Sequence, residues 1–83
     1  MPALRQLHIR FFAVLREQAG CSTLEVHTAA NTSAGLYTEL QSKHPLTFPV
    51  ALLRVSINER YADMTTPLCA GDRVVFIPPV AGG

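Results

Sequence analysis

The sequence predicts an α+β domain in which one helix covers one face of a small mixed sheet. Short apolar segments with a two-residue period occur near both ends of the chain, and one segment between them has helical spacing. The chain has 83 residues, of which 48% are hydrophobic and 16% are charged. This length and composition are typical of one packed domain, so we expect a single domain over residues 1–83.

The first two predicted strands form a hairpin. Leu7, Ile9 and Phe11 alternate with more polar neighbours, as in a strand with one buried face. Residues 13–18 are rich in good helix formers and a glycine follows soon after them, which indicates a short helical turn. The next apolar alternation, at residues 24–26, is close enough in the sequence to pair with the first strand in an antiparallel hairpin.

The main helix is predicted where Leu36, Tyr37 and Leu40 fall at helical spacing. The pair His44–Pro45 ends it, because the residue before a proline disfavours helical backbone angles. Gly35 has a low helix propensity. Either the helix packs closely against the sheet at this position, or the chain simply accepts the loss of helix stability. Three residues are candidates for the N-terminal cap: Asn31, Thr32 and Ser33.

Two further strands are predicted in the second half of the chain. Residues 53–57 alternate between apolar and polar side chains, and residues 73–78 form an apolar run after a turn at residues 70–72. We expect residues 61–68 to be irregular, with one short element. This order predicts a β-grasp (ubiquitin-like) fold, with four to five strands on one main helix and a flexible C-terminal tail over residues 79–83.

Strand parity predicts an apolar patch on the face of the sheet that the helix leaves open. If Val74 and Phe76 point inward, the residues that alternate with them point outward, and the same alternation in the first strand turns Phe12 outward. A contiguous apolar patch suggests a partner. The alternatives are a register shift at a bulge, or a cover formed by residues 13–20. The apolar patch consists of Phe12, Tyr61, Val75 and Ile77.

The sequence offers little for catalysis by the chain alone. His8, His27 and His44 lie in different predicted elements without metal-ligand spacing, so we expect no metal site. No two carboxylates suggest an acid–base pair, and Asp72 is interpreted as a turn residue. Neither glycine-rich fingerprint for nucleotide phosphates occurs. Both cysteines are interpreted as structural, and we expect no stably bound cofactor.

Composition also narrows the class of partner and the location. The formal net charge is +1 and the basic residues form no run, so nucleic acid is not an expected partner. No apolar segment approaches the roughly 20 residues that span a bilayer, and the first residues lack an apolar signal segment. We therefore expect no membrane association and a cytoplasmic location.

The sequence ends in Gly82–Gly83, shortly after the apolar segment 74–80. Glycine has no Cβ, so such an end can approach another protein's backbone closely and present its α-carboxylate to an enzyme. Chain ends are also often small and frayed, so the dipeptide alone is an ambiguous sign.

Several segments together resemble the family of small, sulfur-carrying subunits of molybdopterin synthase (MoaD-like). They are residues 10–17 with the sequence RFFAVLRE, Gly20, Asn58, and the C-terminal block 71–83 with the sequence GDRVVFIPPVAGG. The C-terminal block is the most specific part, because the Gly-Asp turn, the apolar strand, Pro-Pro-Val and Gly-Gly occur together and in this order.

The resemblance implies a ubiquitin-like sulfur carrier that is not catalytic alone. A ubiquitin-activating-type enzyme (MoeB-like) would use ATP to adenylate the carboxylate of Gly83. A sulfur donor, such as a cysteine desulfurase or rhodanese, would then supply the sulfur for a thiocarboxylate. The tail, with Gly82 giving steric clearance, would insert into the large synthase subunit (MoaE-like) and donate sulfur to cyclic pyranopterin monophosphate. The resemblance implies that carrier and large subunit form a heterotetramer. The expected partner-contact residues are Phe12, Tyr61, Val75, Ile77, Pro78, Pro79, Val80 and Ala81.

Other functions stay open at this point. The chain is compatible with a sulfur carrier for thiazole synthesis, cysteine synthesis or tRNA thiolation, because the reactive group is common to all of them. A ubiquitin-like protein modifier would instead form isopeptide bonds with lysines. A non-covalent β-grasp binding module would make the terminal glycines incidental, and a tag placed after Gly83 would then leave its function unaffected.

Overall fold

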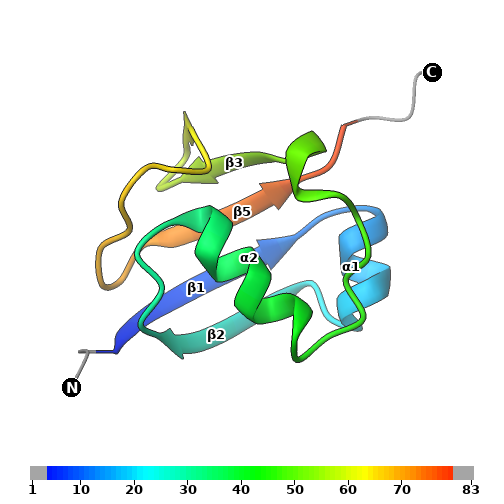
Figure 1. Ribbon diagram of the computed structural model, residues 1–83, viewed down its shortest axis with the longest axis horizontal. Helices are drawn as coiled ribbons and strands as arrows, with labels where there is room; N and C mark the ends of the chain where they lie inside the picture. Colours follow the sequence, from blue (N-terminus) through cyan, green and yellow to red (C-terminus); the bar gives the residue numbers. More distant parts are fainter. Residues whose placement is uncertain (1–3, 80–83) are drawn as a thin grey trace.

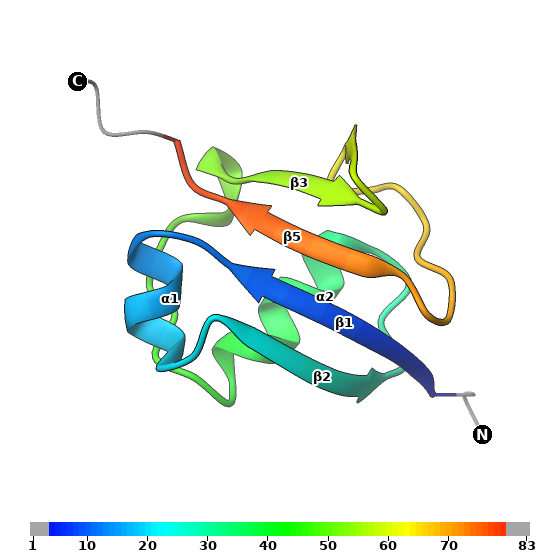
Figure 2. The same ribbon diagram turned by 180° about the vertical axis from the view of Figure 1, so that it is seen from behind.

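The computed structural model describes residues 4–79, whose backbone forms a five-stranded sheet, two α-helices and one 3₁₀ helix (Figure 1). In chain order the elements are β1 (Arg5–Phe11), α1 (Val14–Ala19), β2 (Thr23–Thr28), α2 (Ser33–Gln41), η1 (Val50–Leu52), β3 (Arg54–Ile57), β4 (Arg60–Ala62) and β5 (Arg73–Ile77). Helix α2 lies across one face of the sheet, and α1 lies beside the end of β1. Figure 2 shows the other face, across which no described helix runs, and we call it the open face.

The strand order in the sheet is β2-β1-β5-β3-β4. Strand β1 pairs antiparallel with β2 and parallel with β5. Strand β3 pairs antiparallel with both β5 and β4. The two hairpins β1–β2 and β3–β4 thus flank the last strand, and α2 lies between the hairpins in the sequence. This arrangement confirms the predicted β-grasp fold.

The core lies between α2 and the face of the sheet that α2 covers. Val74 and Phe76 of β5 are fully buried, as strand parity predicted. The ring of Phe76 stacks on Phe11 at a centroid distance of 6.4 Å and lies 5.4 Å from the ring of Tyr37. These three aromatic rings therefore join β1, β5 and α2 in one packed cluster. The other residues that were predicted to be inside are also buried: Leu7, Ile9, Leu36 and Leu40.

Tyr37 carries a hydroxyl group into this core. The hydroxyl donates a hydrogen bond of 2.8 Å to the carbonyl oxygen of Phe48, which satisfies it away from water. Burial also raises the pKa of the Tyr37 hydroxyl above its ordinary value of 10.0, because the ionised form would lose its hydration. The neutral tyrosine thus ties α2 to the loop before η1.

The N-terminal cap of α2 is Thr32, one of the three predicted candidates. Its side-chain oxygen accepts a hydrogen bond of 3.2 Å from the N–H of Gly35. The helix ends at Gln41, before the predicted stop at His44–Pro45. The suggestion that Gly35 packs closely against the sheet is wrong, because Gly35 is exposed and a Cβ there would meet only Thr32 Oγ1 at 3.5 Å and the Cβ of Ala30 at 3.8 Å.

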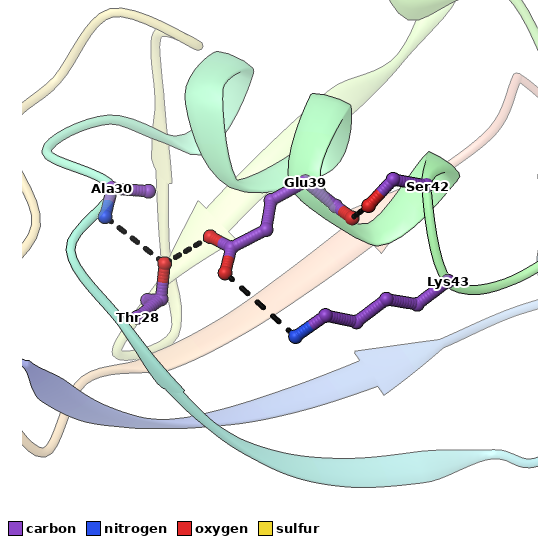
Figure 3. Close-up of polar contacts among 5 residues, drawn as sticks. All are labelled: Thr28, Ala30, Glu39, Ser42 and Lys43. Atoms are coloured by element: carbon purple, nitrogen blue, oxygen red, sulfur yellow. Dashed lines mark hydrogen bonds and ion pairs between the residues drawn. The ribbon is translucent and has the colours of Figure 1, made fainter.

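Polar contacts attach α2 to the end of β2 (Figure 3). Thr28, which is buried, donates a hydrogen bond from its hydroxyl to Glu39 and accepts one of 3.0 Å from the N–H of Ala30. The second carboxylate oxygen of Glu39 lies 3.9 Å from Lys43 Nζ, and the Ser42 hydroxyl donates to the Glu39 carbonyl oxygen at 2.6 Å. One carboxylate therefore links the helix to the strand edge beside it.

The segment 61–68, predicted to be irregular, contributes a strand at its start. Strand β4 (Arg60–Ala62) pairs with β3 and forms an edge of the sheet. The predicted short element is therefore present, and it is a strand, which the sequence did not predict. The last strand ends at Ile77, one residue earlier than predicted.

The helical turn predicted for residues 13–18 is α1, which ends at Gly20 in the left-handed conformation. The packing of Cys21 fits its interpretation as structural, and the same interpretation of Cys69 stays a prediction. Cys21 packs half-buried against the core, whereas Cys69 is exposed, and both are free thiols.

Candidate functional site

The apolar patch lies on the open face of the sheet. In the ladders, Val75 of β5 is paired with Arg10 on one side and with Ser56 on the other, and Ser56 is paired with Tyr61 of β4. Residues paired across a ladder point to the same face. Val75 and Tyr61 therefore face away from α2, in one row across the sheet.

A second row continues the patch at the end of β5. Ile77 is paired with Arg54 in the β3–β5 ladder. On its other side, the β1–β5 register ends at the pair Phe11–Phe76, so the next residue of each strand, Phe12 and Ile77, continues in the same direction. The parity argument that turned these residues outward is confirmed.

The patch residues are open to solvent to different degrees. Phe12 is 40% exposed and Tyr61 81% exposed, while Val75 and Ile77 are half-buried. Helix α1 does not bury Phe12, so the alternative of a cover over the patch is not realised by residues 13–20. Ser56 separates Val75 from Tyr61, which stands at the sheet edge about 10 Å from β5, or two strand spacings. The patch is therefore continuous on the β5 side and has an isolated aromatic residue at the edge.

Charged side chains border the patch. The guanidinium carbon of Arg10 lies 4.8 Å from the centroid of the Phe12 ring, over its face. One row further along the sheet, His8 Nδ1 lies 3.2 Å from a carboxylate oxygen of Glu25, and an open hollow of the surface lies among these side chains, Arg73 and Val75. The open face thus combines apolar side chains with arginines.

A hydrogen-bonded clamp fixes the start of β5. The side chain of Asn58 donates to Asp72 at 2.8 Å and accepts from the N–H of Arg73 at 3.0 Å. The second carboxylate oxygen of Asp72 accepts from the N–H of Cys69 at 2.7 Å, and Asp72 is buried. Asp72 therefore does more than form a turn, because it joins the β3–β4 turn to the strand that leads into the tail.

The β3–β4 turn has the backbone that this clamp requires. Asn58 and Glu59 both have positive φ angles, 52° and 71°, as in the type I′ turns that suit the twist of hairpins. Asparagine tolerates this conformation better than most residues. From the sequence, Asn58 belongs only to a family resemblance and Asp72 only to a turn. Their contact shows that together they hold the start of β5.

The root of the tail lies at the end of β5, next to the patch. Pro78 is buried and Pro79 is exposed, and Pro79 is the last described residue. The other predicted tail residues lie outside the described residues: Val80, Ala81, Gly82 and Gly83. The site thus consists of the open face and the proline pair at its edge.

The described part of the chain shows neither a metal site nor a membrane-spanning helix. Among residues 4–79, no three histidine, cysteine or acidic side chains gather closely enough to hold a metal ion. Within the same residues, neither α-helix has the length and apolar character needed to cross a bilayer.

Comparison with known proteins places the chain in a family. The ThiS family matches residues 9–83. The chain is 33% identical over 81 residues to the molybdopterin synthase sulfur carrier subunit of Mycobacterium tuberculosis, in an alignment that covers 94% of this chain and 98% of that protein.

Two solved structures are similar to the fold described above. Small archaeal modifier protein 1 of Haloferax volcanii has a TM-score of 0.77 at 26% identity, with coverage of 92% of this chain and 99% of that one. A chain from the complex of subunits 1 and 2 of the molybdopterin-converting factor of Helicobacter pylori has a TM-score of 0.66 at 28% identity, with coverage of 94% and 99%. With the family match over residues 9–83, these likenesses show that the chain belongs to the ThiS family.

Proposed function

We propose that this chain is the sulfur carrier subunit of a molybdopterin synthase, with Gly83 as its reactive end. The observation that carries the proposal is the match along 98% of the length of a molybdopterin synthase sulfur carrier subunit. The complex of subunits 1 and 2 in Helicobacter pylori supports a large subunit as the partner of this chain.

The chemistry begins at the α-carboxylate of Gly83. A terminal carboxylate has a pKa of about 3.3–3.7, so it is ionised at neutral pH and is a poor acyl electrophile. A carboxylate oxygen attacks the α-phosphate of ATP in an activating enzyme, which releases pyrophosphate and leaves an acyl adenylate. A hydrosulfide equivalent from a sulfur donor then attacks the carbonyl carbon, AMP leaves, and a thiocarboxylate results. ATP is thus consumed by the partner, and no nucleotide stays bound to the carrier.

The thiocarboxylate then acts in the large subunit. Its sulfur displaces an oxygen substituent from a carbon of cyclic pyranopterin monophosphate, which forms a thioester with Gly83. Water then cleaves the bond between the Gly83 carbonyl and the sulfur, which leaves the sulfur on the product and restores the carboxylate. Two such transfers build the dithiolene group of molybdopterin. A heterotetramer with two carriers and two large subunits fits this requirement for two sulfur atoms. We place this chemistry in the cytoplasm, where the activating enzyme and the sulfur donor would act.

Each part of the chain has a task in this proposal. The patch docks on the partner, and the tail reaches a buried site while the domain stays outside. Pro78 and Pro79 restrict φ at the root of the tail, which lowers the entropy lost when it is threaded into a channel. From Pro79 to Gly83 an extended chain spans about 17 Å. Gly82 leaves room for the reacting carbonyl group.

The test is the intact mass of untagged protein after incubation with the cognate activating enzyme, ATP and a sulfur donor. We expect a mass gain equal to one oxygen exchanged for one sulfur, located at Gly83 by fragmentation. The matched control is the variant that lacks Gly83, which should stay folded and gain no mass. Absence of the gain in the full chain, with an enzyme active on another carrier, would overturn the proposal.

A second candidate function is a protein modifier, and the likeness to small archaeal modifier protein 1 favours it. In that function the activated Gly83 carbonyl is attacked by a lysine amine of a target protein, which forms an isopeptide bond and releases the activating group. Digestion of cell extracts would then yield lysines that carry the C-terminal fragment of this chain. If the protein forms a thiocarboxylate and no such conjugates are found, the result supports the sulfur carrier function. If the sulfur instead serves thiazole synthesis, cysteine synthesis or tRNA thiolation, a strain that lacks this protein should lose the product of that pathway.

A further inference from the structure

Two arginines border the apolar patch on the open face. Arg10 is the ladder partner of Val75, and Arg54 is the ladder partner of Ile77. Because paired residues point to the same face, both guanidinium groups belong to the face that carries the patch. Both arginines are exposed.

Neither arginine has a carboxylate within 4.0 Å among residues 4–79. Arg73, on the same face, differs from them because its guanidinium lies 3.9 Å from the carboxylate of Glu59. Arg10 instead stacks over the ring of Phe12. Arg54 lines a surface hollow that also includes Asp63, but the two side chains form no ion pair. Positive charge is therefore uncompensated where the open face is most apolar.

We propose that the surface of the large subunit that covers the patch carries carboxylates opposite Arg10 and Arg54, around an apolar centre. This inference rests on the proposed function and adds the chemistry by which the partner is recognised. Arginine binds a carboxylate through two parallel hydrogen bonds, which fix orientation as well as position. A partner without acidic groups would remove the hydration water of the Arg10 and Arg54 guanidinium groups when it buried the patch. Because nothing would replace that water, binding would lose free energy.

Other occupants of this face fit the charges less well. Nucleic acid would need a continuous basic stripe, but the face also carries Glu25 and Glu59, and the net charge of the chain is only +1. A second copy of the chain, docked by a twofold axis through the patch, would bring Arg10 and Arg54 towards the same arginines of the other copy. Nucleic acid has no carboxylates, and those of a second copy on this face, Glu25 and Glu59, already lie beside His8 and Arg73.

The experiment measures the dissociation constant between the full-length chain and its cognate large subunit at low and high salt. We expect Arg54→Glu to weaken binding about tenfold or more, and Arg10→Glu to do the same, because each turns an attraction at the rim into a repulsion. Arg10→Lys keeps the charge and should lose less affinity than Arg10→Glu. Raising the salt concentration should weaken wild-type binding and reduce the difference between wild type and variants.

Arg60→Glu is the matched control. It makes the same change in charge, but Arg60 pairs with Ile57, which pairs in turn with the buried Val74. Arg60 therefore stands on the covered side of the sheet. We expect it to change the dissociation constant by about twofold or less. Circular dichroism checks that every variant is folded.

The outcomes separate this inference from the proposed function. If wild type forms the thiocarboxylate and binds the large subunit, but Arg10→Glu and Arg54→Glu bind as well as wild type or no worse than Arg60→Glu, acidic recognition is wrong and the carrier function stands. If the wild-type protein does not bind the large subunit at all, both the acidic recognition and the proposed function are wrong. If wild type instead self-associates and the two variants change that equilibrium, a second copy is the occupant and the inference is overturned.

Discussion

The two faces of the sheet are made by the same strands, but one is buried in the core and the other is open to solvent. On β5, Val74 and Phe76 face α2 and are fully buried, whereas Val75 and Ile77 point to the open face and stay half-buried. The covered face holds the aromatic cluster, and the open face holds apolar side chains bordered by arginines. Because the side-chain period of a strand is two, neighbouring residues can serve stability and recognition separately.

The quantity that a substitution changes should therefore reveal the face on which the residue lies. Changes on the covered face should lower the free energy of unfolding, and changes on the open face should weaken binding with the fold intact. Four substitutions test that separation, in decreasing order of the expected change in free energy.

Phe76→Ala should cause the largest loss of stability. The ring is fully buried and touches Phe11 and Tyr37, so its removal leaves a cavity at the centre of the core. We expect the free energy of unfolding to fall by about 3–5 kcal/mol, measured by urea denaturation. Val75→Ala, the neighbouring residue on the open face, is the control and should cost about 1 kcal/mol. Equal losses for both variants would contradict the division between the faces.

Phe12→Asp should weaken binding of the large subunit by about 2 kcal/mol, or roughly 30-fold in the dissociation constant. Phe12 is 40% exposed, so the unfolding transition should move little. Ile77→Asp should have an effect of similar size. Leu52→Asp is the control, because Leu52 is 57% exposed on η1 and is not part of the patch. If Leu52→Asp weakens binding as much as Phe12→Asp, the docking surface is not the patch.

Asp72→Asn should destabilise the fold by about 1–3 kcal/mol, because an amide cannot replace both acceptor oxygens of the buried carboxylate. The Asn58 amide and the Cys69 N–H would compete for the one remaining oxygen. Thermal unfolding of Asp72→Asn and of the exposed control Asp63→Asn gives the comparison. A transition temperature unchanged in both would show that the clamp contributes nothing.

Tyr37→Phe should have the smallest effect, about 1 kcal/mol at neutral pH, from the lost hydrogen bond to Phe48. The raised pKa of Tyr37 adds a pH dependence with a definite sign. Below pH 10 the folded and unfolded chains both keep the proton, so the stabilisation is complete. Above the ordinary pKa of 10.0 the unfolded chain loses the proton first, so the free energy of unfolding falls as the pH rises through the folded pKa.

The measurement is denaturation at a series of pH values between neutral and strongly alkaline. Tyr37→Phe should remove part of the alkaline fall that wild type shows. The chain has one other tyrosine, Tyr61 on the open face, and Tyr61→Phe should follow the wild-type curve. An alkaline fall that persists in Tyr37→Phe and vanishes in Tyr61→Phe would reverse the assignment.

The elements of the covered face could be predicted from the sequence because each has a local pattern. Helical spacing located α2, and alternation located β1, β3 and β5 to within a few residues. Strand β4 was missed because its three residues, Arg60 to Ala62, lie at an edge with one partner and show no clear alternation. The low propensity of Gly35 was a poor guide, since an exposed helix position can simply accept that cost.

The sequence predicted the apolar residues of the site, but not the contacts between residues that lie far apart in the sequence. Parity along single strands placed Phe12, Val75 and Ile77 on one face. The Asn58–Asp72 contact joins residues 14 apart and depends on the pairing of β3 with β5, so the pattern of either segment alone does not contain it. The uncompensated charge of Arg10 and Arg54 likewise appears only when the ladders are known. The roles of the residues beyond Pro79 stay predictions.

The position of β5 in the sheet determines how the domain resists a force applied at Pro79. A pull on Pro79 acts along β5, which is hydrogen-bonded to β1 on one side and to β3 on the other. The ladder bonds run across the strand, so a force along it loads them together in shear instead of opening them one after another. The strand that leads to Pro79 is therefore held on both sides, and a force on Pro79 has to break two ladders together before the domain unfolds.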